Sequence, residues 1–288
     1  MARRRLPDEP NSKLAVWSRR FAFFSVAAAL IAIIIVRAGL LEVQPGMFTF
    51  AGALAFGAIG ILLALLSFIP IWRQGLSGLG YSVTAILIGG LLLGYPAYLG
   101  YKAYKLPEIA DISTDILDPP GFDAIRRLRS RATNPVQYAG LHAAEQQREA
   151  YPEISTLELT VPPKVAYEHA LALVTKRRWL LMDAREPIPG RRDGRIEAVA
   201  RTPVMGFRED VVIRIRGNDE ESRVDMRSSS RYGSHDIGSN ASRIRSYLDN
   251  VEEAIDVALE REERKKPTAP KKGPAPKGKQ QQAQSPKR

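Results

Sequence analysis

Three long apolar stretches occupy the first hundred residues of the chain. The first, Phe21 to Leu41, is apolar apart from Ser25 and Arg37, while Met47 to Ile71 and Leu79 to Tyr101 carry no charge. A helix needs roughly 20 apolar residues to cross the hydrocarbon core of a bilayer. The pattern therefore predicts three transmembrane helices within residues 21–101.

Two other interpretations of these stretches fit the sequence less well. A cleavable signal peptide has a shorter apolar stretch and a small-residue cleavage site, whereas here two more apolar stretches follow at once. Core helices of a soluble protein would need a large polar shell, and the connections Glu42 to Gly46 and Trp72 to Gly78 are too short to supply one. We expect all three helices to be retained in a membrane.

The basic residues that flank the three stretches predict an orientation. Residues 1–20 hold six Lys and Arg, and Arg73 follows the second stretch, against Arg37, Lys102 and Lys105 on the other side. The positive-inside rule then places a basic N-terminus, residues 1–20, in the cytoplasm. Everything after Tyr101 is expected outside it, which in a Gram-negative bacterium means an inner-membrane protein with a periplasmic C-terminal domain.

Small residues inside the stretches indicate close helix contacts. Gly90 and Gly94 form a small-xxx-small pattern, and Gly52, Gly57 and Gly60 add small positions to the second stretch. We interpret both sets as packing among the three helices. Because mid-membrane Asp, Glu, Lys and His are missing and Arg37 lies near one end, transport is not favoured.

Residues 102–150 read as a linker with two helices. Leu106 to Gly121 is rich in Asp and Pro, which prevents a continuous helix and predicts an extended segment. Phe122 to Arg131 and Val136 to Ala150 have helical composition but no strong apolar stripe.

Residues 151–264 show the pattern of an α+β domain. Thr156 to Val161 alternates as a strand does, and Pro162 opens an amphipathic helix that runs through Arg178. Ser239 or Asn240 can cap a last helix that continues to about Glu263. Four strands are predicted between the helices, at Trp179 to Ala184, Ile196 to Thr202, Asp210 to Arg216 and Arg223 to Ser228. We expect a two-layer domain, mostly antiparallel sheet, in the order strand, helix, four strands, helix.

The last hairpin can be given a register from its alternation. Pairing Ile215 with Val224 and Ile213 with Met226 puts these apolar residues on one face. The opposite face then places Arg214 across from Asp225, Arg216 across from Arg223 and Val212 beside Arg227, and Glu197 and Arg201 could join it from the preceding strand.

This second face is arginine-rich, and two interpretations of it stay open. It can be a solvated face with compensating cross-strand ion pairs. It can also recognise an anion, since planar guanidinium groups suit carboxylates and phosphates. The candidates on this face are Arg201, Arg214 and Arg216.

Charge and composition narrow the function classes. The formal net charge of +11 comes from the two ends, while Lys102 to Arg264 holds 26 basic and 28 acidic residues. The folded domain therefore has no basic field for nucleic acid. The absence of cysteine excludes disulfides, thiolate metal sites and a cysteine nucleophile, and no cofactor is indicated. Residues 265–288, rich in Lys, Pro and Gln, predict a disordered tail, either solubilising or in contact with anionic lipid or polymer.

Two segments resemble the domain-of-unknown-function family 1499. They are the Asp-Ile-Ser-Thr-Asp sequence from Asp111 with Asp118-Pro-Pro-Gly-Phe122, and the serine- and arginine-rich string from Arg227 to Ile244. The likeness extends from about Leu106 to Leu259. The family's paired acids appear here as Glu209-Asp210, and only some members carry membrane helices in front. The resemblance implies no activity and carries over no catalytic residue.

The string from Arg227 to Arg243 is the strongest candidate site in the sequence. It combines hydroxyls, guanidinium groups and glycines next to a helix N-terminus, where anions bind readily. The candidate anion-binding residues are Arg227, Ser228, Ser230, Arg231, Gly233, Asp236, Gly238, Asn240 and Arg243. The alternative is that Asp236, Asn240 and the serines hold a strand-to-helix loop together by side-chain-to-backbone hydrogen bonds.

Catalysis has little support in the sequence. Ser230, His235 and Asp236 form the one tempting nucleophilic set, although adjacent His and Asp side chains usually diverge. His235 and Asp236 together with Asp225 would offer too few soft ligands for a metal site. We therefore expect a membrane-tethered binding or scaffold module, with an anionic envelope ligand or a protein as partner. A membrane-anchored hydrolase-like enzyme of the cell envelope is the alternative.

Overall fold

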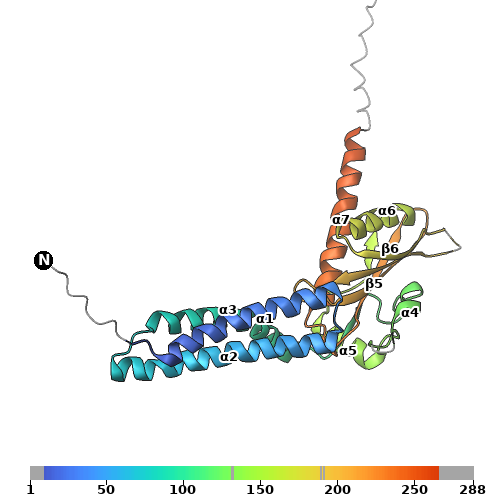
Figure 1. The fold of residues 1–288 in the computed structure, drawn as a ribbon. Helices are drawn as coiled ribbons and strands as arrows, with labels where there is room; N and C mark the ends of the chain where they lie inside the picture. Colours follow the sequence, from blue (N-terminus) through green and yellow to red (C-terminus); the bar gives the residue numbers. More distant parts are fainter. Residues whose placement is uncertain (1–9, 131–132, 189, 191, 266–288) are drawn as a thin grey trace, which may run out of the picture.

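The computed structural model describes residues 10–130, 133–188, 190 and 192–265. Three long helices form a rod, and one globular domain lies at the end of the rod (Figure 1). The last helix of the domain projects away from the rod. The predicted basic N-terminus falls partly, and the predicted tail almost wholly, outside the described residues.

The rod consists of α1 (Lys13–Ala38), α2 (Val43–Gln74) and α3 (Leu79–Lys105), each long and apolar enough to cross a membrane. The residues that these helices turn toward one another are small, apart from Val36. They are Ala15, Ser18, Ala22, Ser25, Ala29, Ala32 and Val36 in α1, Gly46, Ala53, Gly57, Gly60, Ala64 and Ser67 in α2, and Ser82, Ala85 and Gly89 in α3. Spacings of three, four or seven residues along each row permit close backbone contact.

The glycine prediction holds for only part of the set. Gly57 and Gly60 are buried against α1, as expected. Gly52, Gly90 and Gly94 have no neighbouring atom where a Cβ would lie, so their assignment to packing among the three helices was wrong. Helix α3 instead turns Ser82, Ala85 and Gly89 toward its partners, because this row continues the small-residue seam.

The domain is built on one six-stranded sheet of antiparallel pairs. Its order is β1-β6-β5-β4-β3, and β2 pairs with the other end of β6. The strands are β1 (Asp111–Ser113), β2 (Leu157–Leu159), β3 (Leu180–Arg185), β4 (Gly194–Arg201), β5 (Arg208–Gly217) and β6 (Ser222–Ser230). The predicted α+β class and antiparallel sheet are confirmed, while β1 was missed.

Helices α6 (Pro163–Lys176) and α7 (Ser239–Lys265) cover one face of this sheet (Figure 1). The main core lies there, where Ile213, Ile215 and Met226 meet Tyr247 and Val251. Trp179 stacks on Tyr247 with ring centroids 5.3 Å apart. The predicted pairs Ile215–Val224, Ile213–Met226 and Arg214–Asp225 are all present in the β5–β6 ladder, so the register prediction is confirmed.

The linker covers part of the opposite face of the sheet, where Phe122 and Ile125 pack against Val199 and Val212. It contains β1, the short helix α4 (Ala124–Leu128) and α5 (Leu141–Ala150), both shorter than predicted. Helix α4 begins where the backbone N–H groups of Asp123 to Ile125 donate to the buried Glu197 carboxylate, and it ends just before Arg129, whose side chain binds Asp210.

The domain is held on the rod by the turn between β4 and β5. Arg37, at the end of α1, donates to the carbonyl oxygens of Pro203 at 2.5 Å and Val204 at 2.9 Å. Arg201 Nη1 donates in return to the Arg37 carbonyl at 3.1 Å. Gly206 lies so close that an added Cβ would meet Arg37 Cγ at 3.0 Å. A side chain predicted to reach the membrane surface therefore also docks the domain.

Candidate functional site

The serine- and arginine-rich string forms a closed polar cluster at one end of the sheet. Ser228 and Ser230 lie in β6 rather than in a loop, because β6 continues to Ser230. Their hydroxyls face α7, where Asn240 bonds both of them, at 2.7 and 2.9 Å. Arg243 donates to Ser228 and to the buried carboxylate of Glu209.

Asp236 caps the start of α7. Its carboxylate accepts the backbone N–H groups of Gly238, Asn240 and Ala241. Burial raises the pKa of Asp236, although these three donors oppose the shift. Burial and the neighbouring Asp236 also raise the pKa of Tyr151 to about 12. The left-handed Gly233 and Gly238 shape the loop that brings Asp236 to the helix.

The arginines of the string are engaged by carboxylates of the same chain. Arg231 donates to Asp210 at 2.7 and 2.9 Å, and Arg129 binds the other oxygen of Asp210 at 2.5 Å. Arg227 binds Asp111 at 2.6 Å and donates to the carbonyl oxygen of Pro120. A free anion would have to displace these carboxylates, so the anion site in this string stays a prediction.

The arginine-rich sheet face is only partly solvated. Arg214 is 5% exposed and binds Asp115, Asp118 and the fully buried Asp225 at 2.8 to 3.0 Å. Arg216 joins the same three carboxylates at 3.0 to 3.3 Å. The prediction of a solvated face was wrong for Arg214, because the linker brings two more carboxylates onto it.

Burial opposes the charged form of Asp115, but backbone N–H donors from Asp118 and Leu117 and the charges of Arg214 and Arg216 outweigh it. Together they hold the pKa of Asp115 below its ordinary value. This network of ion pairs fastens the linker to the sheet.

Arg201, the third predicted residue of the sheet face, lies apart from this network. It pairs across the β4–β5 ladder with Arg208, and its guanidinium reaches the end of α1 at Arg37. Arg37, Arg201 and Arg208 are all exposed. Arg208 was not among the residues predicted from the sequence. The sequence signal for it is its position at the start of a strand, opposite Arg201.

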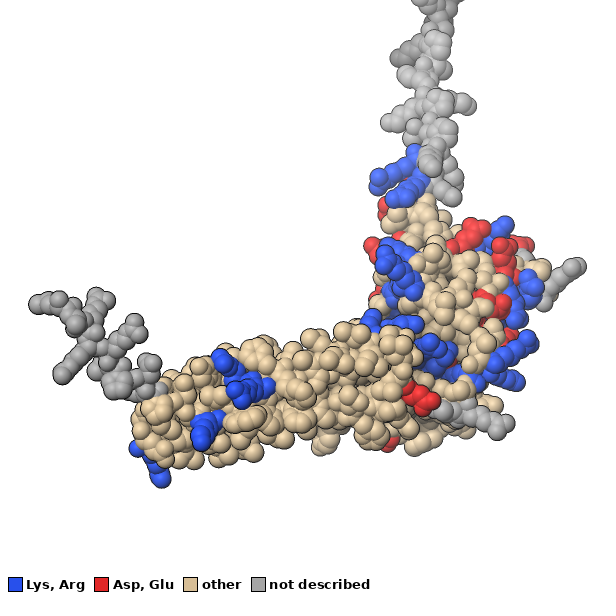
Figure 2. Space-filling view, viewed as in Figure 1, with Lys and Arg blue, Asp and Glu red and all other residues tan. Residues whose placement is uncertain are grey.

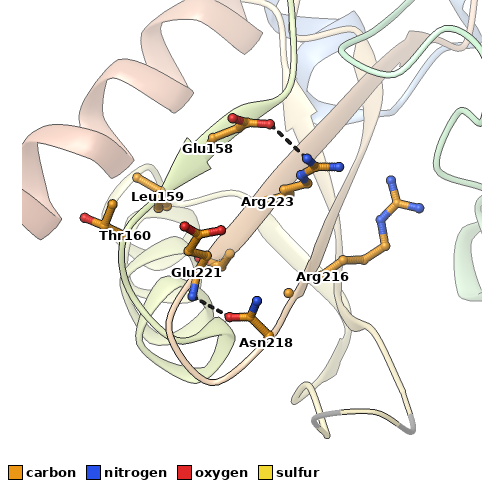
Figure 3. Close-up of a pocket in the computed structure, with 9 residues that line it drawn as sticks. Glu158, Leu159, Thr160, Arg216, Asn218, Glu221 and Arg223 are labelled. Carbon is orange, nitrogen blue, oxygen red and sulfur yellow. Dashed lines mark hydrogen bonds and ion pairs between the residues drawn. The ribbon is translucent and has the colours of Figure 1, made fainter.

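An open hollow lies at the opposite end of the sheet, around the β5–β6 hairpin. It has a volume of about 590 Å³ and is lined by Glu158, Leu159, Thr160, Arg216, Gly217, Asn218, Glu221, Ser222 and Arg223. Figure 3 shows the ion pair between Glu158 and Arg223 at one edge of it, with nitrogen and oxygen atoms at 3.2 Å. The side-chain Oδ1 of Asn218 accepts a hydrogen bond from the backbone N–H of Glu221 and so shapes the hairpin. Of the residues that line the hollow, Arg216 was a candidate on the sheet face, and none belongs to the string from Arg227 to Arg243.

Ser230, His235 and Asp236, the candidate nucleophilic set, do not form a hydrogen-bonded triad. Ser230 Oγ donates to Glu209 at 3.2 Å and accepts from Asn240, while Asp236 is used as the helix cap. His235 Nδ1 is buried and has no hydrogen-bond partner within the described ranges. Across the same residues, no group of three or more His, Cys, Asp or Glu side chains is placed to hold a metal ion.

Comparison with known proteins places the globular domain in a family. Residues 111–251 match the model of a family described as a protein of unknown function, DUF1499. No curated protein and no solved structure matches the chain. The match spans β1 through about the first half of α7 and includes both segments on which the resemblance was based. The globular domain behind the three apolar helices belongs to the domain-of-unknown-function family 1499.

Proposed function

We propose that this protein is a membrane-tethered binding or scaffold module, with its three helices in the bacterial inner membrane and its domain at the periplasmic surface. The observation that carries the proposal is the reversed polarity of the rod. Its interior is made of Ala, Gly and Ser, while large apolar side chains such as Phe24, Leu62 and Leu91 are more than half exposed. A rod of this kind is stable in lipid rather than in water.

The ends of the rod support the same placement. Trp17 and Trp72 lie near one end with Arg19, Arg20 and Arg73, and four exposed tyrosines lie near the other, with Lys102 and Lys105 in the last turn of α3. The tyrosines are Tyr95, Tyr98, Tyr101 and Tyr104. Aromatic and basic residues are enriched where membrane proteins meet lipid headgroups. Figure 2 shows the rod between these ends as a largely uncharged surface, with charge gathered over the domain.

The hollow at the β5–β6 hairpin supports the binding role. The β4–β5 turn docks on the rod, and β5 then runs ten residues to the hairpin, which is about 33 Å at the rise of a strand. The hollow therefore opens at the end of the sheet remote from the rod. Its mixed charges, from Glu158, Glu221, Arg216 and Arg223, suit a polar envelope ligand or protein segment.

A labelling experiment tests the membrane placement and the orientation. Because the chain has no cysteine, Gln74→Cys at the end of α2 and Ser242→Cys in α7 each give one exposed thiol. We expect a membrane-impermeant maleimide to label Ser242→Cys in intact cells and Gln74→Cys only after the inner membrane is opened. The reverse pattern would contradict the orientation, and equal labelling of both in intact cells would contradict the membrane crossing.

A further inference from the structure

Three exposed arginines gather at the junction of the rod and the domain. Arg37 ends α1, Arg201 ends β4, and Arg208 begins β5. Arg201 and Arg208 are direct cross-strand partners, and Arg201 donates to the Arg37 carbonyl at 3.1 Å. Like charges directly opposite each other in a ladder are unfavourable unless an anion compensates them.

No carboxylate in the described part of the chain forms an ion pair with any of these three arginines. The two acids that follow Arg208 are already engaged, because Glu209 pairs with Arg243 and Asp210 with Arg129 and Arg231. Glu42, in the turn after α1, is exposed and makes no ion pair with the cluster. The three-arginine cluster therefore keeps its positive charge.

The cluster lies at the level expected for lipid headgroups. Between Arg20 and Arg37, α1 carries no charge, and at 1.5 Å per residue this distance is about 25 Å. That is close to the thickness of a hydrocarbon core, and arginine side chains extend readily to its edge.

The third helix reaches the same level. Ser25, Gly57 and Leu92 meet inside the rod. Arg37 lies 12 residues after Ser25 in α1, and Lys102 and Lys105 lie 10 and 13 residues after Leu92 in α3. The three basic residues are therefore at the same level of the rod to within about one helical turn. These two lysines therefore add to the positive charge at this end of the rod.

We propose that Arg37, Arg201 and Arg208 bind the phosphate of an anionic phospholipid at the membrane surface. Arg37 uses Nη1 on the Pro203 and Val204 carbonyls, which fixes its guanidinium next to the strand ends while other N–H groups stay available. Planar guanidinium groups match phosphate oxygens in pairs. The bound lipid would then join the domain to the bilayer at the point where the domain docks on α1. This proposal rests on the proposed membrane placement.

The test measures lipid retained by the full-length protein. The protein is reconstituted in nanodiscs with equal amounts of phosphatidylglycerol and phosphatidylcholine, and co-purifying lipid is counted by native mass spectrometry. A basic residue near an anionic membrane surface strengthens attraction roughly fivefold. We expect the wild-type protein to retain phosphatidylglycerol over phosphatidylcholine by at least about 25-fold, and Arg201→Gln with Arg208→Gln to lower this ratio by about 25-fold, because each arginine contributes about fivefold.

Matched variants separate the site from general charge. Arg126→Gln with Arg127→Gln removes the same charge from exposed positions of α4 and should leave the ratio unchanged, while Arg208→Lys should keep most of it. Equal retention of both lipids by the wild-type protein, or an equal loss in the α4 variant, would overturn the proposal. Displacement of phosphatidylglycerol by millimolar inorganic phosphate would also overturn it, because the site would then bind free phosphate. If the maleimide labelling contradicts the membrane crossing, the proposed membrane placement is wrong. If the labelling agrees with it and both lipids are retained equally, only the proposed lipid site is wrong.

Discussion

At the scale of single residues, the domain is held by charges buried in pairs. Glu209, Asp210 and Asp225 are at most 3% exposed, and each binds at least one arginine. Alternation along β5 and β6 was enough to predict which residues share a face. It could not predict Asp111, Asp115 and Asp118 as partners, because they lie about a hundred positions earlier and reach the sheet only when the linker folds over it.

Removing one member of a buried pair should destabilise the domain strongly. Arg243→Ala leaves the Glu209 carboxylate buried with only the hydroxyls of Ser230 and Ser239 as partners. Such a loss costs about 3–5 kcal/mol. Urea unfolding followed by Trp179 fluorescence, with Trp17 and Trp72 replaced by Phe, measures the change.

Arg126→Ala provides the comparison for that measurement. Its side chain is exposed and forms no ion pair within the described residues, so the unfolding free energy should change by less than about 0.5 kcal/mol. Equal effects of the two substitutions would show that the Arg243–Glu209 pair does not stabilise the fold.

At the scale of elements, period and turn signals predicted the order of β2, α6, β3 to β6 and α7. Strand β1 escaped because three residues, Asp111 to Ser113, are too few to show an alternation, and its Asp and Pro surroundings indicate a coil. Helices α4 and α5 were predicted too long because the sequence signal for helix extends beyond the helices that form. Their composition is helical, but buried contacts with Glu197, Asp210 and Arg227 hold the chain between them in another path.

The β4–β5 turn should loosen when its contact with α1 is removed. Arg37→Ala deletes two hydrogen bonds from a charged donor, each worth about 1.5–3 kcal/mol at most. We expect amide hydrogen exchange at Gly206 and Phe207 to quicken on the order of tenfold or more, while exchange in the β5–β6 ladder stays the same. Unchanged exchange in the turn would show that the domain does not depend on Arg37 for its docking.

At the scale of the whole molecule, apolar length alone predicted three membrane helices, and the structure adds the reversed polarity of the rod. The sequence could not show that Arg37 ties the rod to the domain, because its partners are backbone carbonyls more than 160 positions away. In the proposed membrane placement, this docking would hold the domain at the membrane surface with its open hollow facing away from the lipid.

The most direct test of this account places a nitroxide spin label at Leu62, an exposed position in the middle of α2, and at Ser242 in the domain. The protein is reconstituted in bilayers, and relaxation by oxygen is compared with relaxation by a water-soluble nickel chelate. The account predicts that oxygen dominates at residue 62, because oxygen concentrates in hydrocarbon, and that nickel dominates at residue 242. Dominant nickel relaxation at both positions would contradict it.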